Sequence, residues 1–460
     1  MPIRKLDISH LDTSGAQYGA NLTYVASNAR FEWVSGIYIP RSLSPDWSQT
    51  PTESKIVASD AQGVSQFSGD YFGEASDISS DGNYVIVGAS GEDGGGGDPY
   101  TDCGAAYIFV RSGSSWSQQA KLLASDRAIN DRFGQSVSIN EDGTRAIVGA
   151  QADNNVDGAA YIYFRSGTSW SQQQKISGET NQFDRFGEEV TMSSDGNYVL
   201  IYATREDTGG SDVGATYVYV RSGSSWSQQA KITSPNPENY QRFGSALSLN
   251  EDGTYAVIGA YGEAVSSLAD AGAVYIYTRS GSSWSQQTRL TSASPTSSNQ
   301  FGNSVSINAD GTTLAIGEVA GDTEASAAGE VYIFTRSGST WTQQALLTAS
   351  DAETGDLFGA KVSLSADGNH VVIGALSEDT GGSLAGAAYV FARSGSTWTQ
   401  KAKIQASDKQ ANDYFSQSVS INSNGSFVIS GAKFEGGGAG NPKPYSGAAY
   451  IYEVGGYGYS

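Results

Sequence analysis

The fold is decided by residues 133–170, FGQSVSINEDGTRAIVGAQADNNVDGAAYIYFRSGTSW, which recur along the chain with small changes. Polar and apolar residues alternate in SVSIN (136–140), and small, β-branched and aromatic residues fill AIVGA (146–150) and GAAYIY (158–163). Runs of this kind predict β-strands. A fourth run, WSQQQKI (170–176), follows the second turn, so each unit is predicted to hold four strands.

The unit occurs seven times. Its Phe-Gly pair returns about every 57 residues, a spacing typical of stacked or radial repeats. The phenylalanines are Phe72, Phe133, Phe186, Phe243, Phe301, Phe358 and Phe415, and only the last is followed by serine, Ser416, instead of glycine.

Two turns punctuate every unit. The first is an Asp-Gly or Asn-Gly pair, which favours a two-residue hairpin turn, and it begins at Asp81, Asp142, Asp195, Asp252, Asp310, Asp367 and Asn424. The second is RSGSS or a close variant, and its arginine stands five residues before a tryptophan in six units. Seven units of two hairpins each, without a helical pattern, predict an all-β, seven-bladed β-propeller of four-stranded antiparallel blades. A β-solenoid is the alternative, but its rungs are shorter and do not carry two hairpins each.

The ring is predicted to close through the N-terminus. The seventh unit reaches Tyr450 but lacks a tryptophan strand, whereas DWSQTPTESKIVASD (46–60) resembles that strand. We therefore expect Trp47 to complete the last blade beside Tyr450, leaving no unpaired edge. Residues 36–42, GIYIPRS, also resemble the tyrosine strand and compete with the strand at Tyr450 for the same place in the blade. Pro40 has no N–H to donate to a neighbouring strand, which argues against residues 36–42.

Composition excludes several functions. The net charge of −21 repels nucleic acid and anionic membranes. One cysteine, Cys103, and two histidines leave no set of soft metal ligands. No apolar run is long enough for a secretory signal or a membrane helix. We expect no cofactor, with Ca²⁺ as the one candidate ion.

The Phe-Gly opening and the Gly-Ala pairs such as Gly149-Ala150 resemble FG-GAP repeats, the blades of integrin α-subunit heads. The resemblance implies a seven-bladed adhesion propeller and, in many relatives, a calcium loop. The hairpins here carry only Asn-Glu-Asp-Gly or Ser-Ser-Asp-Gly, which is short of the spaced carboxylates that such a loop needs.

Residues 14–33 resemble the N-terminal segment of tail-fibre and other virion proteins of marine bacteriophages, particularly cyanophages. The alternative for this segment is a flexible leader.

Two acidic sets are candidate sites. The first stands two residues before the Phe of each Phe-Gly pair, where five aspartates could form a partial ring at one mouth of the central channel and bind a cation or a polyhydroxylated ligand: Asp70, Asp131, Asp184, Asp356 and Asp413, with Gln241 and Asn299 in the other copies. The favoured alternative is that each aspartate caps its own turn.

The second set lies in the loops after the second strand, as Glu92-Asp93, Glu206-Asp207 and Glu378-Asp379. Adjacent carboxylates match a glycosidase pair poorly.

These observations predict two parts, a virion-attachment segment at 1–36 and a propeller at 37–460. We expect a non-enzymatic bacteriophage virion protein, a fibre, tip or decoration, that is assembled in the host cytoplasm and exposed on the particle. Its partners would be other virion proteins and a glycan or protein of the host surface, without nucleic acid or membrane insertion. The alternatives are an extracellular integrin-like adhesion protein that uses divalent cations, and a propeller glycosidase.

Overall fold

The computed structural model describes residues 21–25, 30–34, 45–61, 69–93, 101–178, 183–436, 443 and 445–454. The chain divides into two units, Met1–Ser44 and Pro45–Ser460. In the first unit, β1 (Asn21–Val25) pairs antiparallel with β2 (Arg30–Val34). The predicted domain boundary at residues 36 and 37 and the competing strand at 36–42 lie outside the described residues.

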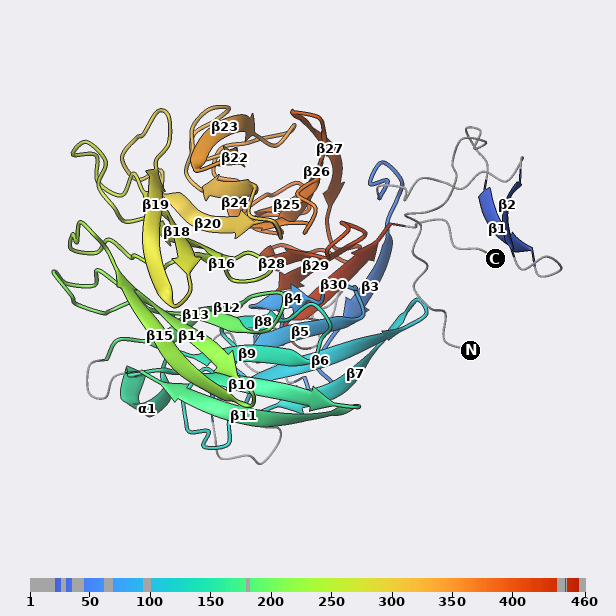
Figure 1. The fold of residues 1–460 in the computed structure, drawn as a ribbon, viewed down its shortest axis with the longest axis horizontal. Coiled ribbons are helices and arrows are strands. Elements are labelled where there is room, and N and C mark those ends of the chain that lie inside the picture. Colours follow the sequence, from blue (N-terminus) through green and yellow to red (C-terminus); the bar gives the residue numbers. More distant parts are fainter. Residues whose placement is uncertain are drawn as a thin grey trace. The chain divides into compact units, whose positions relative to one another are not determined.

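The described part of the second unit forms seven four-stranded antiparallel sheets, the blades, drawn in Figure 1. Blades one to three are β4 (Ser76–Ile78), β5 (Tyr84–Ala89), β6 (Ala105–Ser112) and β7 (Ser115–Leu122); β8 (Val137–Ile139), β9 (Arg145–Ala150), β10 (Ala159–Ser166) and β11 (Ser169–Ser177); and β12 (Phe186–Met192), β13 (Tyr198–Ala203), β14 (Ala215–Ser222) and β15 (Ser225–Thr233). Blades four and five are β16 (Leu247–Leu249), β17 (Tyr255–Ala260), β18 (Ala273–Ser280) and β19 (Ser283–Leu290); and β20 (Phe301–Ile307), β21 (Thr313–Glu318), β22 (Glu330–Ser337) and β23 (Thr340–Leu347). Blade six is β24 (Phe358–Leu364), β25 (His370–Ala375), β26 (Ala387–Ser394) and β27 (Thr397–Ile404), and blade seven is β28 (Phe415–Ile421), β29 (Phe427–Ala432), β30 (Ala448–Glu453) and β3 (Thr52–Ile56).

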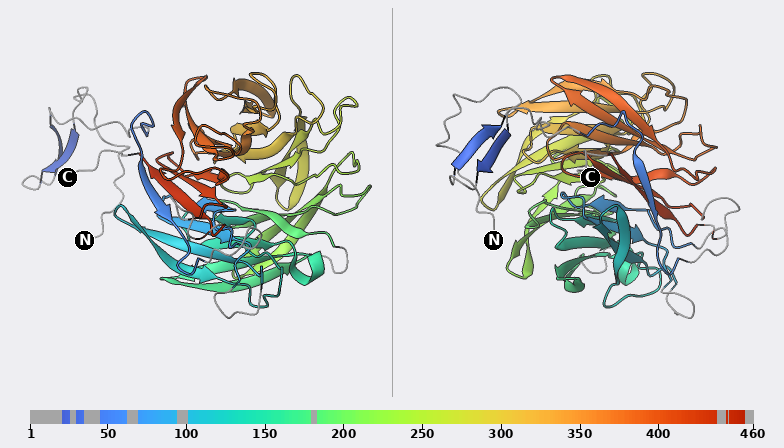
Figure 2. Two further views of the ribbon diagram at one scale, coloured as in Figure 1. Left: turned by 180° about the vertical axis from the view of Figure 1, so that it is seen from behind. Right: turned by 90° about the vertical axis from the view of Figure 1, so that its right-hand side faces the viewer.

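The blades stand around a common axis, and the first strand of each blade lies innermost (Figures 1 and 2). The predicted seven-bladed, all-β propeller is thereby confirmed. The short α1 (Asp153–Val156) is the one helix among the described residues. No helix in the described part of the chain has the length and apolar character needed to cross a bilayer.

The predicted ring closure is also confirmed. Strand β3, from the start of the propeller, pairs antiparallel with β30 from its end, and Lys55 lies opposite Tyr450. The blue and red strands lie side by side in Figure 1. Trp47 precedes this strand, in a turn where the Gln49 N–H donates to the Asp46 carbonyl, and its indole is buried between blades six and seven. The other six repeat tryptophans lie within their strands.

Close backbone contacts between blades explain the recurring glycines. A Cβ on Gly88, near the end of β5, would lie 1.8 Å from the carbonyl oxygen of Gly134 in the next blade. Gly134 itself has a φ of +97°, which disfavours other residues. Beside this contact Phe133 is fully buried and meets the Tyr161 ring edge-on at 5.3 Å between centroids. The Phe-Gly and Gly-Ala pairs are therefore parts of the interface between blades.

Candidate functional site

The propeller has two different ends. Because the strands of a blade alternate in direction, the Asp-Gly and RSGS-type turns lie at one end. The connection between the second and third strands and the crossing to the next blade lie at the other end, which we call the loop rim. The turns repeat nearly unchanged, whereas the rim segments vary in sequence and length. Variable loops on a rigid frame are where recognition commonly resides.

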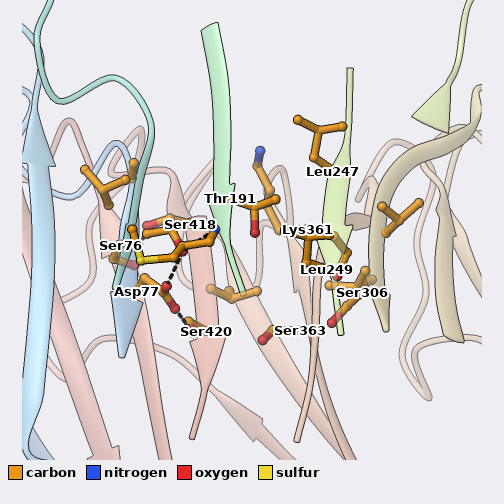
Figure 3. A pocket seen from close by; sticks show the side chains of 18 of the residues that line it. Ser76, Asp77, Thr191, Leu247, Leu249, Ser306, Lys361, Ser363, Ser418 and Ser420 are labelled. Carbon is orange, nitrogen blue, oxygen red and sulfur yellow. Dashed lines mark hydrogen bonds between the residues drawn. The ribbon is translucent and has the colours of Figure 1, made fainter. Parts of the chain in front are cut away.

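A polar channel follows the axis (Figure 3) and encloses about 310 Å³. Its narrow ring is formed by the same position of each innermost strand, which holds one carboxylate and six hydroxyls: Asp77, Ser138, Thr191, Ser248, Ser306, Ser363 and Ser420. Most of these side chains accept a backbone N–H from the next blade, for example Ser306 from Leu364 at 2.9 Å. The ring is thus part of the framework.

Asp77 of blade one links the first blade to the last through hydrogen bonds. Its carboxylate accepts the Ile139 N–H at 2.9 Å, the Ser420 hydroxyl at 2.8 Å and the Ser138 hydroxyl at 3.1 Å. Burial raises the pKa of Asp77, although these hydrogen bonds favour its ionised form. Glu189 and Lys361 also line the channel, as do Glu74, Glu141 and Glu251. Burial raises the pKa of Glu189, and the ammonium of Lys361 opposes that change.

The five predicted aspartates are buried in their own turns. The side chains of Asp131, Asp356 and Asp413 each accept the N–H of the residue three positions earlier. In all five copies the aspartate carbonyl accepts an N–H from the loop after the second strand, as Asp70 does from Gly91 and Asp184 from Arg205. None of the five is among the residues that line the channel, and the structure favours the alternative that they serve their own turns. Burial raises the pKa of Asp131 and Asp413 to about 6. Ligand binding by these residues stays a prediction.

The loop carboxylates predicted as a second set are engaged by cations. Glu92 lies 2.7 Å from the ammonium of Lys121, and Glu378 lies 2.7 Å from that of Lys403. Glu206 contacts Lys231 at 2.9 Å. Burial favours a higher pKa for Glu206, but hydrogen bonds from Thr208 and Lys231 outweigh burial, so the pKa of Glu206 lies below its usual value. Carboxylates that are neutralised in this way serve the framework.

Four aromatic rings gather on the loop rim where blade seven meets blade one. Phe434 is the centre, and it meets Tyr71, Tyr414 and Tyr445 edge-on at centroid distances of 5.7, 5.2 and 5.5 Å. All four side chains are half-buried, so each keeps part of its surface open to solvent. We call these residues the aromatic cluster.

The backbone holds the aromatic cluster in place. The three tyrosines adopt positive φ angles of 53–65°, which bulky residues rarely do. Hydrogen bonds oppose this strain, since the Tyr71 N–H donates to the Tyr445 carbonyl and the Phe434 N–H to the Asp413 carbonyl. The residues at the same position in the other blades, such as Arg132, Arg185 and Leu357, also have positive φ angles, so this backbone conformation belongs to the repeating frame. Lys433 lies over the Phe434 ring and 3.5 Å from Glu74, so charge also borders the cluster.

No repeated motif of the sequence predicted this cluster. Its extremes, Tyr71 and Tyr445, are 374 residues apart in the sequence, and only ring closure brings them together. One signal was available, because the residue before Phe-Gly is aromatic in the first and seventh copies alone.

Comparison with protein families gives one match. The model of the FG-GAP repeat matches residues 47–109, 116–163, 170–219, 226–277, 284–334, 341–391 and 398–452. Each matched segment begins at a repeat tryptophan, so the sequence repeat is offset by one strand from the blade. No curated protein matches the chain.

Proposed function

This chain belongs to the FG-GAP repeat family, and on that premise we propose that it is a non-enzymatic binding protein whose loop rim holds a glycan of a cell surface. The aromatic cluster carries this proposal. Tyrosine and phenylalanine offer an apolar face beside a polar edge, which suits ligands that are apolar on one side and hydroxylated on the other. The faces of sugar rings have this character.

The rigidity of the aromatic cluster supports the same conclusion. Binding loses affinity when side chains and loops must be ordered, and the rings of Tyr71, Tyr414 and Tyr445 already stand on hydrogen-bonded backbone. Lys433 and Glu74 add charged groups beside the rings. The loop carboxylates Glu92, Glu206 and Glu378 contact lysines, which favours binding over acid and base catalysis.

We further propose that the protein is a bacteriophage virion component, a fibre, tip or decoration. Residues 1–36 would attach it to other virion proteins, and the propeller would face the host. The resemblance of residues 14–33 to virion proteins of marine phages supports this part. Display in many copies would raise the avidity of a weak single contact.

Binding is tested with immobilised glycans and extracted host polysaccharide. Tyr71→Ala and Phe434→Ala are each expected to weaken binding at least tenfold, because about 1.4 kcal/mol of contact energy corresponds to that factor. Tyr240→Ala is the matched control, since Tyr240 is 58% exposed on the rim between blades three and four. Loss of binding in the control alone would refute the assignment to the aromatic cluster.

Virion attachment is tested separately by mass spectrometry of purified particles. The polypeptide is expected in intact phage, and the chain without residues 1–36 is expected to be absent from particles assembled while it is expressed. Particles that lack the wild-type polypeptide would refute the virion role and leave the glycan assay to decide the binding role.

A further inference from the structure

In six of the seven blades, a basic side chain on the outermost strand neutralises a buried carboxylate from the rim. The nitrogen–oxygen distances are 2.5–2.9 Å, and the pairs are Lys121–Glu92, Lys175–Asp153, Lys231–Glu206, Arg289–Glu263, Lys403–Glu378 and Lys55–Glu435. Burial of a carboxylate is unfavourable without such a partner. The pairs therefore belong to the repeating framework.

Blade five lacks both members of this pair. Leu346 lies opposite Tyr332 in the register where Lys121 lies opposite Tyr107 in blade one. Gly321, three residues after the end of β21, takes the position that Glu92 has after β5. Leu346 is 38% exposed, so its replacement of a basic residue is not required by packing.

Two glutamates occupy the interior of blade five instead. Glu318, the last residue of β21, lies directly opposite Glu330, the first residue of β22. The corresponding pairs in the other six blades are all Ala–Ala: Ala89–Ala105, Ala150–Ala159, Ala203–Ala215, Ala260–Ala273, Ala375–Ala387 and Ala432–Ala448. Glu330 fills the space above Gly321, where a Cβ would lie 2.4 Å from its Cγ.

The two carboxylates are buried without a cation. Glu318 is 0% exposed and Glu330 is 4% exposed. Glu330 accepts the Tyr332 hydroxyl at 2.6 Å and the hydroxyl of Thr323. Both carboxylate oxygens of Glu318 are buried, and neither accepts a hydrogen bond of ordinary geometry. No lysine or arginine forms an ion pair with either glutamate among the described residues.

Neutral oxygen donors surround the pair. The hydroxyl of Tyr332 lies 3.0 Å from that of Ser292, which follows the outer strand of blade four. Burial and the neighbouring Glu330 raise the pKa of Glu318, while the side chains of Asn299, Tyr332 and Ser292 lie near enough to oppose that rise. Asn299 stands where five other blades carry an aspartate, so this blade places a neutral amide there.

We propose that blade five binds a hard divalent cation of the calcium class between Glu318 and Glu330. Two carboxylates balance its charge, and hard cations take oxygen ligands from carboxylates, amides and hydroxyls. The described residues hold no group of three or more Asp, Glu, His or Cys side chains suited to a metal. Asn299, Ser292 and Tyr332 would therefore complete the shell. The site lies inside a blade, away from the Asp-Gly hairpins, and it is independent of glycan binding at the aromatic cluster.

Calcium binding to the chelator-treated full chain tests the proposal, by isothermal titration calorimetry and by thermal melting with and without CaCl₂. The wild type is expected to bind one Ca²⁺ per chain and to melt at a higher temperature with it. The double variant Glu318→Ala, Glu330→Ala restores the Ala–Ala pair of the other blades. It is expected to lose both the binding and the shift.

Leu346→Lys is the second variant, and it leaves both glutamates in place. Its ammonium would take the position of the cation, as lysine does in the other blades, so Ca²⁺ binding is expected to fall at least tenfold while the metal-free melting temperature rises. Glu378→Gln, in blade six, is the matched control and should keep calcium binding. A wild type that binds neither Ca²⁺, Mg²⁺ nor Mn²⁺, or variants that bind Ca²⁺ like the wild type, would overturn the proposal.

Discussion

The ring closure makes Trp47 the most informative single position for stability. Its side chain is 1% exposed, and its indole N–H donates to the Gly425 carbonyl of blade seven at 2.7 Å. A tryptophan covers about 150–250 Å² when buried. At about 25 cal/mol per Å², this burial is worth about 4–6 kcal/mol.

Trp47→Ala is therefore expected to lower the free energy of unfolding by about 4 kcal/mol, within the range found for large aromatic residues in cores. The lost hydrogen bond lies inside this figure, because its net contribution is about 1 kcal/mol. The loss also loosens the segment that precedes β3, which leaves β30 less protected as an edge.

Urea unfolding followed by circular dichroism measures this change, since the signal does not depend on the deleted indole. Trp284→Ala is the matched control. Trp284 also donates its indole N–H, to Gln229 at 2.8 Å, but its side chain is only half-buried in an outer strand. If Trp47→Ala proves no more destabilising than Trp284→Ala, the reasoning that the N-terminal segment seals the ring is wrong.

Three further predictions concern buried polar groups. Asp77→Ala should lower the free energy of unfolding in urea by about 2 kcal/mol, because the Ile139 N–H loses its acceptor. Asp77→Ser keeps an acceptor, and an equal loss there would contradict this explanation. Lys403→Met should lower the same free energy by about 2–3 kcal/mol because Glu378 stays buried without its ammonium, and a loss no larger than that of the exposed control Lys401→Met would contradict the pairing. Asp131→Asn tests the pKa of about 6, which lies above the unfolded value of 3.8. Stability from this carboxyl is present at pH 4 and lost as pH rises through 6, so the variant should gain up to about 3 kcal/mol over the wild type between pH 4 and pH 7. Parallel pH profiles would refute it.

Much of the fold could be predicted because its signals are local. The Asp-Gly pairs specify tight hairpins, and runs such as SVSIN at 136–140 alternate with the period of a strand. The missing tryptophan strand after Tyr450 and the spare one near Trp47 indicated how the ring closes, and β3 confirmed it. The strand was nevertheless shorter than expected, since a turn at residues 46–49 separates Trp47 from it.

Site predictions were weaker because they depended on the direction of side chains. The aspartates such as Asp131 were candidates for a ring at a channel mouth, with capping of their own turns as the favoured alternative, and the side chains of Asp131, Asp356 and Asp413 do cap their turns. Asp77 is one of the carboxylates that line the channel, and it stands at a position where the other six copies carry serine or threonine. A single departure from a repeat marked the residue, but the sequence did not show that it faces the axis.

The sequence by itself determined the unit, its number of copies and the way the circle closes, because turn chemistry and strand periodicity act between near neighbours. Only the tertiary structure decided which departures from the repeat meet one another. Glu318 and Glu330 face each other because strand register sets them opposite. Tyr71 and Tyr414 both contact Phe434 because the first and last blades lie side by side. Proximity of this kind depends on the path of the whole chain, which no local pattern encodes.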